Sequence, residues 1–433
     1  MDMIWFLSAL WLFSLLPPGV VATLGIAQLL GNIKVGFLVL GPFDLVVPLI
    51  FLSIAFRPTV IRTFYQDHPR LTWVFSTFCV WSLMLMSFSL VSVAVGQTEV
   101  IIGLLRLTKF IASAMWCPLL YTYCRARRSG DIIKWVMYIS MLLVAISILG
   151  TANQAYLVAE ARSAAQGTTI ALKEDLPFSG NGASVLLATS SAFFLVAIVK
   201  RTWQILLVLP LLVALLTTTG RAGYLGLFSA IVYILIRNRK FSSAAIAVII
   251  VLVGYGFSFV PIIGAAIYTL LGKGDSDILF MASNGRVPIY EFFFNEIALE
   301  KLFYGSGFGV WGGGSGLPEH TMHNFLLQMW AESGVIGMLL CVWLTIEMIR
   351  QSKGNIRTGK YQELNWYYTE GFRAALIAVF SASMTETYLY GGPILSSLCA
   401  YLGLTLARTS PGRHVSLRQN RGVSLKHLPV KIT

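Results

Sequence analysis

Residues 203–236 read WQILLVLPLLVALLTTTGRAGYLGLFSAIVYILI, and Arg221 is the one charged residue among them. A helix that crosses a bilayer needs about 20 mainly apolar residues. The apolar stretches on either side of Gly220-Arg221 therefore each predict a membrane-spanning helix. Between these two helices the sequence places an arginine flanked by Gly220 and Gly223.

The rest of the chain has the same character. Of its 433 residues, 56% are hydrophobic and 12% are charged, against about 25% charged in an ordinary soluble protein. This composition excludes soluble enzymes, nucleic-acid binders and disordered chains. Apolar runs lie near 3–30, 36–56, 71–95, 101–123, 132–150, 184–199, 203–219, 222–236, 241–262, 325–349, 369–389 and 392–407. We therefore expect an all-α polytopic membrane protein with about 12 transmembrane helices.

The basic residues predict the topology. With the N-terminus in the cytoplasm, 21 lysines and arginines fall in inside loops and the C-terminal tail, and seven fall outside. The positive-inside rule then places both termini in the cytoplasm. The net charge of +13 follows from this asymmetry and does not indicate a nucleic-acid partner.

The expected domain organisation has four parts. Residues 1–262 hold transmembrane helices 1–9, residues 263–324 form a large periplasmic loop, residues 325–407 hold helices 10–12, and residues 408–433 form a basic cytoplasmic tail suited to anionic membrane lipid. The large loop contains a short amphipathic stretch at 287–303 and a Gly-rich stretch at 305–314. A loop of this length with its own helix is usually functional.

Charged residues on the outer side are scarce, so each is a candidate. Arg221 suits an anion clamp, because flanking glycines let a ligand approach the backbone and a guanidinium binds phosphate oxygens in pairs; the alternative is an arginine that snorkels to lipid head groups. Arg286 precedes the amphipathic stretch, where it opposes the helix dipole; a surface ion pair with Glu291 is the alternative.

His323 lies where the large loop returns to the membrane. Its imidazole could take a proton from a sugar hydroxyl or orient it, although a histidine at a helix start is more often structural. Arg106 and Lys109 share one face of the fourth span and are candidates as intramembrane cations; the alternative is that a tilted helix or a shifted span boundary puts them at the membrane interface. Glu386, near the outer end of its span, is a suitable partner for an arginine. The cysteines and histidines show no metal-site pattern, so we expect no metal and no cofactor.

These residues together resemble the O-antigen ligase and polymerase superfamily of bacterial inner-membrane proteins. The resemblance rests on Gly220-Arg221-Ala222-Gly223 between two spans, on the loop stretch 302–309 (LFYGSGFG), and on His323-Asn324 followed by Gly334 and Gly337. It covers about residues 203–342.

The resemblance implies a metal-independent membrane glycosyltransferase whose active site faces the periplasm. Its donor would be an oligosaccharide on undecaprenyl diphosphate, and its acceptor a glycan or the lipid A core. His323, Arg221 and Arg286 would be catalytic; Arg106, Lys109, Asn324 and Glu386 would bind substrate. Other components of polysaccharide export are expected partners. Polymerisation of exopolysaccharide or O-antigen units is favoured, with O-antigen ligation as the alternative.

A secondary transporter is the alternative from another class, because twelve spans with both ends inside also suit transporters. Transporters usually show two repeated halves and a binding site at the membrane midplane. No repeat is visible here, and the long loops and the candidate residues lie on the outer side. The sequence therefore favours the transferase.

Overall fold

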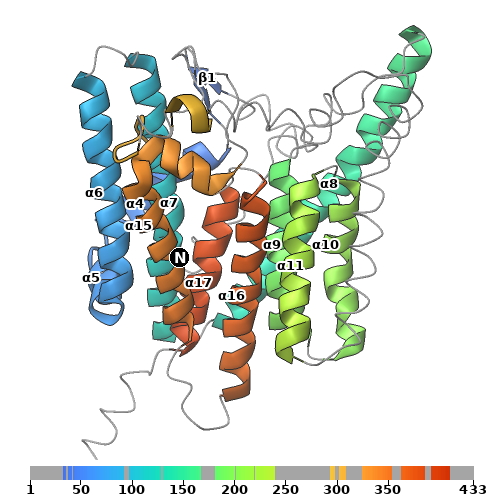
Figure 1. Ribbon diagram of the computed structural model, residues 1–433. Coiled ribbons are helices and arrows are strands. Elements are labelled where there is room, and N and C mark those ends of the chain that lie inside the picture. Colours follow the sequence, from blue (N-terminus) through green and yellow to red (C-terminus); the bar gives the residue numbers. More distant parts are fainter. Residues whose placement is uncertain are drawn as a thin grey trace, which may run out of the picture.

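A computed structural model describes residues 33–35, 38–40, 42–91, 97–127, 130–166, 181–199, 201–218, 220–238, 293–297, 302–308, 324–353, 362–385 and 392–409. Most of its helices run side by side along one direction, although the helix at 130–166 is strongly inclined to the others (Figure 1) and the helix at 42–55 is bent by 81° from the one that follows it. They are α4 (Pro42–Ala55), α5 (Thr59–Asp67), α6 (Pro69–Val91), α7 (Gln97–Arg127), α8 (Gly130–Gln166), α9 (Asn181–Ala197), α10 (Ile205–Thr217), α11 (Arg221–Asn238), α15 (Phe325–Ser352), α16 (Gln362–Ser383) and α17 (Pro393–Thr409).

Three short elements accompany these helices in the described residues. Strands β1 (Ile33–Val35) and β2 (Leu38–Leu40) form one antiparallel pair, a small departure from the all-α prediction. A 3-10 turn at Thr202–Gln204 leads into α10, and a π-helical turn spans Phe293–Ile297. The π-helical turn falls within the stretch 287–303 that the sequence predicts to be amphipathic.

The described helices confirm a membrane protein with several apolar helices. Every predicted span except 3–30 and 241–262, which lie outside the described residues, overlaps a helix. By length and composition, three described helices could each cross a membrane, and a bent pair could add a fourth. The bent pair joins Val46–Ala55 to Thr59–Asp67 at 81°. The bend therefore lies at the end of the predicted span 36–56, which holds the single helix α4 and, before it, strand β2. The count of twelve spans stays a prediction.

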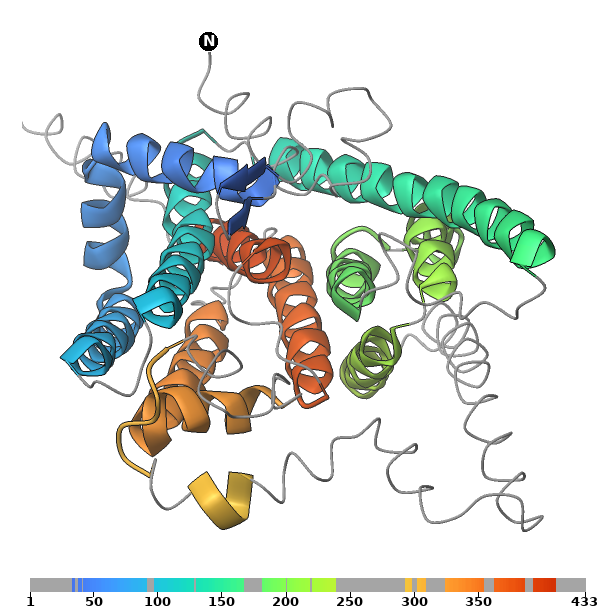
Figure 2. The same cartoon turned by 90° about the horizontal axis from the view of Figure 1, so that it is seen from above.

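The helix order across the bundle follows from the contacts between elements. Helix α7 packs against α17, α17 against α16, and α16 against both α9 and α11; α15 packs against α6 at the edge of the bundle (Figure 2). Close approach depends on small residues: a Cβ added at Gly226 of α11 would lie 2.5 Å from the carbonyl oxygen of Ala378 in α16. The second turn of α11 is therefore fixed against the last turns of α16.

Candidate functional site

Arg221 is the first residue of α11, at the turn that follows α10. The Tyr224 hydroxyl fixes this turn, because it lies 2.9–3.1 Å from the carbonyl oxygens of Leu215, Leu216 and Thr218. Arg221 lies five residues before Gly226, or about 7.5 Å along the helix. It is therefore held at the end of the bundle where α16 finishes.

Gly223 has a different role from the one that the sequence suggested. A Cβ at this position would lie 2.5 Å from the carbonyl oxygen of Ser184 in α9. The space beside the Gly223 backbone is thus occupied by a neighbouring helix and not left for a ligand. Gly223 allows α9 and α11 to touch, and so helps to position Arg221.

Asn324 joins two helices at the same end. Its side-chain oxygen accepts hydrogen bonds from the backbone N–H groups of Leu326 and Leu327, at 3.0 and 3.2 Å, and so caps α15. Its side-chain amide donates to the carbonyl oxygen of Met384, at the end of α16. A cap of this kind stabilises a helix by about 1 kcal/mol. Asn324 therefore fixes the beginning of α15 to the end of α16.

Helix α15 is broken at Gly334, whose φ of 66° and ψ of 178° are accessible essentially to glycine alone. We call Phe325–Ser333 the head of α15 and Val335–Ser352 its shaft. The shaft is about 27 Å long at 1.5 Å per residue, close to the thickness of a bilayer's hydrocarbon core. The head turns away from the shaft across the upper end of the bundle (Figure 1).

A loop at residues 302–308, which we call the clasp, holds the break in place. Two backbone N–H groups of the clasp donate to backbone carbonyl oxygens of the head. Ser306 donates to Ala331 at 2.9 Å, and Gly307 donates to Glu332 at 2.8 Å. The backbone N–H of Val335, the first residue of the shaft, donates to the carbonyl oxygen of Leu302 in the clasp at 2.8 Å. These bonds satisfy backbone groups that the break leaves without helical partners.

Side chains from two other helices support the clasp. The indole N–H of Trp81 in α6 donates to the Ser333 carbonyl oxygen at 2.9 Å. The fully buried ring of Phe308 packs edge-on against Phe78 and Phe110, with ring centroids 5.9 and 5.7 Å away. Gly305, with a φ of 61°, lies against the Glu332 backbone where a Cβ would overlap. Close packing against another backbone therefore explains the motif glycines Gly223, Gly305 and Gly334.

The head also carries a buried carboxylate. Glu332 is fully buried, and the Gln328 side-chain amide donates to its Oε1 at 2.7 Å. Nine residues separate Glu332 from His323, which is about two and a half turns of an ideal helix, so this spacing predicts that the two side chains lie on opposite faces. The described residues include Glu332 and not His323, so this prediction stays untested.

Arg106 and Lys109 lie in the first half of α7, half-buried. Ser113, on the same face, bonds the backbone N–H of Gly392 at 3.0 Å, where α17 begins. Arg106 lies seven residues, or about 10 Å, before Ser113 along the helix. Both cations therefore lie toward the end of the bundle that also holds Arg221 and Asn324.

The structure thus brings four predicted site residues to one end of the bundle: Arg221, Asn324, Arg106 and Lys109. Arg286, His323 and Glu386 lie outside the described residues. His323 directly precedes Asn324 in the chain, and Glu386 directly follows Thr385 at the end of α16. Among the described residues, no three His, Cys, Asp or Glu side chains gather in a way that could hold a metal ion.

Sequence reasoning missed one charged pair. Glu370 and Arg373 belong to α16 and both lie within the predicted span 369–389. The Arg373 Nη1 lies 2.8 Å from Glu370 Oε1. The signal was present, because a charged residue within a predicted span is unusual.

Comparison with known proteins supports the resemblance drawn from the motifs. Residues 205–342 match the family model described as O-antigen ligase. No curated protein matches the chain. The matched segment begins at α10 and ends in the shaft of α15, so it contains Arg221, Asn324 and Gly334. The match confirms the resemblance and supports activity of the O-antigen ligase and polymerase type in surface polysaccharide assembly.

Proposed function

We propose that this integral membrane protein, with its O-antigen ligase segment at residues 205–342, transfers a glycan from undecaprenyl diphosphate to a sugar hydroxyl. The observation that carries the proposal is the gathering of Arg221, Asn324, Arg106 and Lys109 at one end of a helix bundle within and beside that segment. We favour polymerisation of exopolysaccharide or O-antigen repeat units.

The leaving group defines what the site must do. A departing lipid diphosphate needs its negative charge stabilised and needs no proton, and guanidinium groups in a site of low dielectric constant can stabilise it. In the proposal Arg221 and Arg286 bind the diphosphate. Arg221 is suited to this task, because the Tyr224 hydroxyl and the packing of Gly223 against Ser184 hold the first turn of α11 in place.

The acceptor hydroxyl is the other reactant. In the proposal His323 removes or orients its proton, since an imidazole is the side chain best suited to proton transfer near neutral pH. The next residue, Asn324, fixes the chain at this point through its bonds to α15 and to Met384. Arg106, Lys109 and Glu386 contact the donor or the acceptor glycan.

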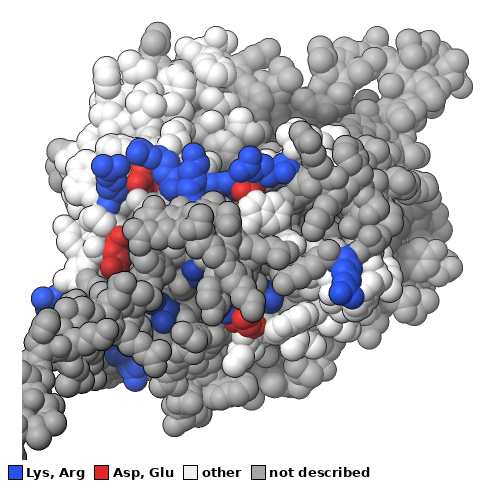
Figure 3. All heavy atoms as spheres, turned by 90° about the horizontal axis from the view of Figure 1, so that it is seen from below, with Lys and Arg blue, Asp and Glu red and all other residues white. Residues whose placement is uncertain are grey.

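The proposed orientation puts this site in the periplasm and both termini in the cytoplasm of an inner membrane protein with about twelve spans. The opposite end of the bundle supports it. Figure 3 views that end and shows lysine and arginine side chains gathered in a row, with a few acidic side chains among them. Exposed basic residues there include Arg57, Arg62, Arg70 and Lys353, as the positive-inside rule expects of a cytoplasmic face.

Ligation of O-antigen to the lipid A core is the alternative, and it has direct support in the description of the matched family. Deletion of the gene distinguishes the two reactions. Single unjoined repeat units on the lipid carrier indicate a polymerase, whereas long lipid-linked chains beside an unsubstituted lipid A core indicate a ligase. Normal surface glycan in the deletion strain contradicts both proposals.

Complementation of the deletion strain tests the site itself. We expect Arg221→Ala and Arg221→Lys both to fail, because a lysine cannot bind two phosphate oxygens in the paired manner of a guanidinium. Arg62→Ala, which removes an exposed arginine of α5 at the opposite end, is the matched control and should restore the glycan. Equal activity of all three variants would show that Arg221 is not in the site.

A transporter remains the alternative from another class. It predicts uptake of labelled substrate by proteoliposomes that contain the purified protein, without formation of any glycan product. The transferase predicts the reverse.

A further inference from the structure

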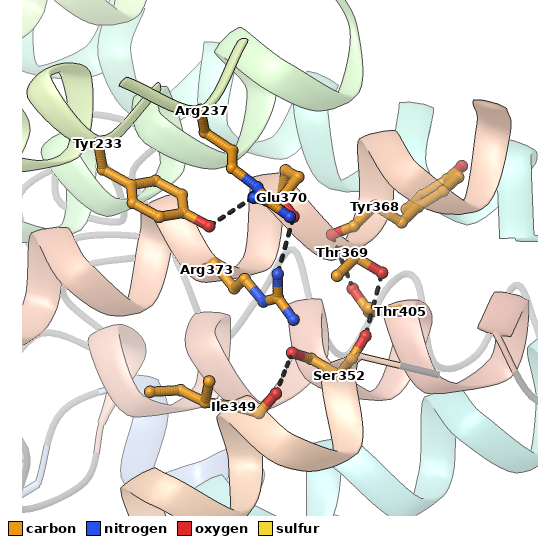
Figure 4. A network of polar contacts seen from close by, with 9 residues as sticks. All are labelled: Tyr233, Arg237, Ile349, Ser352, Tyr368, Thr369, Glu370, Arg373 and Thr405. Carbon is orange, nitrogen blue, oxygen red and sulfur yellow. Dashed lines mark hydrogen bonds and ion pairs between the residues drawn. The ribbon is translucent and has the colours of Figure 1, made fainter. Parts of the chain in front are cut away.

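A second charged site lies at the basic end of the bundle, between α11 and α16 (Figure 4). At its centre the Glu370 side chain is almost completely buried, with 3% of its area exposed. The Arg373 Nη1 lies 2.8 Å from Oε1 of Glu370, and the Arg237 Nε lies 3.6 Å from the same oxygen. The Tyr233 hydroxyl donates to Oε2.

We call Tyr233, Arg237, Glu370 and Arg373 the cluster, and its charges do not balance. Two guanidinium groups share one carboxylate oxygen, and the second oxygen is bonded by a neutral phenol, so the cluster carries a net charge of +1. Arg373 is largely buried, with 13% of its side-chain area exposed, and its Nε is a buried donor without a hydrogen-bond acceptor among the described residues. Two like charges held this close repel each other, most strongly where water is scarce.

The depth of the cluster suggests which molecules can reach it. Arg237 lies 16 residues after Arg221 on α11, which is about 24 Å along the helix. That distance approaches the thickness of the hydrocarbon core. In the proposed orientation this rise brings Arg237 close to the lipid head groups on the side opposite the transfer site, and its side chain is 57% exposed.

We propose that Arg237 and Arg373 form a binding site for one phosphate group, either from an anionic phospholipid or from free phosphate. Arg237 supplies exposed donors at the surface, and Arg373 supplies a buried positive charge behind it. The bound phosphate neutralises the excess charge of the cluster. Basic pockets between helices on the cytoplasmic side of membrane proteins are suited to such head groups.

The same end of the bundle offers a matched control. Arg350 lies 3.6 Å from Glu347, its side chain is 56% exposed, and that of Glu347 is 2% exposed. The N···O distance and the exposed fractions of both side chains are nearly the same as for Arg237 and Glu370, although this pair lies within one helix. It differs because Glu347 makes no ion pair with a second arginine in the described structure and accepts instead from the neutral side-chain amide of Gln351. The Arg350 pair is therefore neutral and should not bind phosphate specifically.

The experiment is native mass spectrometry of the intact, detergent-purified protein, titrated with phosphatidylglycerol and, separately, with phosphatidylcholine of the same acyl chains. We expect preferential retention of phosphatidylglycerol. Arg237→Gln should lower the affinity for phosphatidylglycerol roughly fivefold, since a basic residue near a membrane surface contributes about 1 kcal/mol to binding of anionic lipid. Arg350→Gln should leave it unchanged.

Glu370→Gln provides a test with the opposite sign. It removes the negative charge that competes with phosphate, so the variant should retain phosphatidylglycerol more tightly than the parent protein. Equal losses in Arg237→Gln and Arg350→Gln, equal retention of the two lipids by the parent protein, or weaker binding by a folded Glu370→Gln variant would each overturn the proposal. Competition by inorganic phosphate distinguishes a site for any phosphate from one that requires the lipid.

Discussion

Gly334→Ala tests whether the break in α15 supports the proposed transfer site. The break turns the head of α15 across the end of the bundle, and the Asn324 cap begins that head. Alanine at position 334 faces two difficulties. Its Cβ would overlap the carbonyl oxygen of Phe303 in the clasp, and its backbone would have to keep a φ of 66°.

The expected cost has two parts. The backbone conformation itself costs about 1–3 kcal/mol for a residue other than glycine. If the clasp moves away to relieve the overlap, up to three backbone hydrogen bonds are lost, from Ser306, Gly307 and Val335, each contributing about 1 kcal/mol. We therefore expect a loss of stability of about 3 kcal/mol or more, together with displacement of Asn324 from the end of α16.

Thermal unfolding of the purified protein in detergent and complementation of the deletion strain measure the two consequences. The control is Gly150→Ala in α8, where an added Cβ meets no atom within 4 Å. Alanine in a helix interior stabilises the helix by about 0.5–1 kcal/mol relative to glycine. This variant should therefore unfold at the same temperature as the parent protein or a slightly higher one, and it should remain active.

Two results would refute the reasoning. If Gly334→Ala unfolds at the temperature of the parent protein, the clasp and the break are not coupled as described. If the variant is destabilised and still makes normal glycan, the position of the head of α15 does not matter for transfer.

Three further variants test neighbouring contacts. Asn324→Asp keeps the oxygen that caps α15 and loses the donor to Met384, so it should unfold at a higher temperature than Asn324→Ala and still lose transfer activity. Phe308→Ala removes a fully buried ring and should cost about 3–5 kcal/mol in thermal or denaturant unfolding; a loss below 1 kcal/mol would contradict its packing. His68 should make stability depend on pH. Burial lowers the pKa of its imidazole, so the unfolded chain binds the proton more readily and stability should fall as pH drops below about 6.5. His68→Asn should remove this fall in stability below about pH 6.5. The same dependence of stability on pH in the variant and the parent protein would show that His68 is not its cause.

The sequence predicts helix positions well where apolar runs are long. The runs at 71–95, 101–123 and 325–349 coincide with α6, α7 and α15, because composition alone drives such segments into a membrane. Hydropathy says nothing about direction changes within a run. The 81° bend between α4 and α5 falls at Arg57-Pro58, where proline disfavours a continuous helix. The break at Gly334 is held by backbone bonds to the distant clasp and could be suspected only from the motif glycines.

For the site, the motifs identified residues and left their neighbours unknown. Arg221 and Asn324 could be chosen from sequence, and the structure places them at one end of the bundle. The clasp could not be foreseen, since it joins Leu302 to Val335 and Ser306 to Ala331 through backbone atoms that carry no sequence signal. The buried pair Glu370–Arg373 is visible in the sequence as two charges within a predicted span. The excess charge arises only when Arg237 from another helix lies beside the pair.

Transfer by the purified protein is the most direct test of the central proposal. The protein in detergent or nanodiscs is given an undecaprenyl-diphosphate-linked oligosaccharide with a glycan acceptor, and separately with a lipid A core acceptor, and the products are separated by size. We predict longer glycan products from the parent protein and from Arg62→Ala, and none from Arg221→Lys. Product formation by Arg221→Lys at the rate of the parent protein, or no product from the parent protein with either acceptor, would contradict the proposed transfer site.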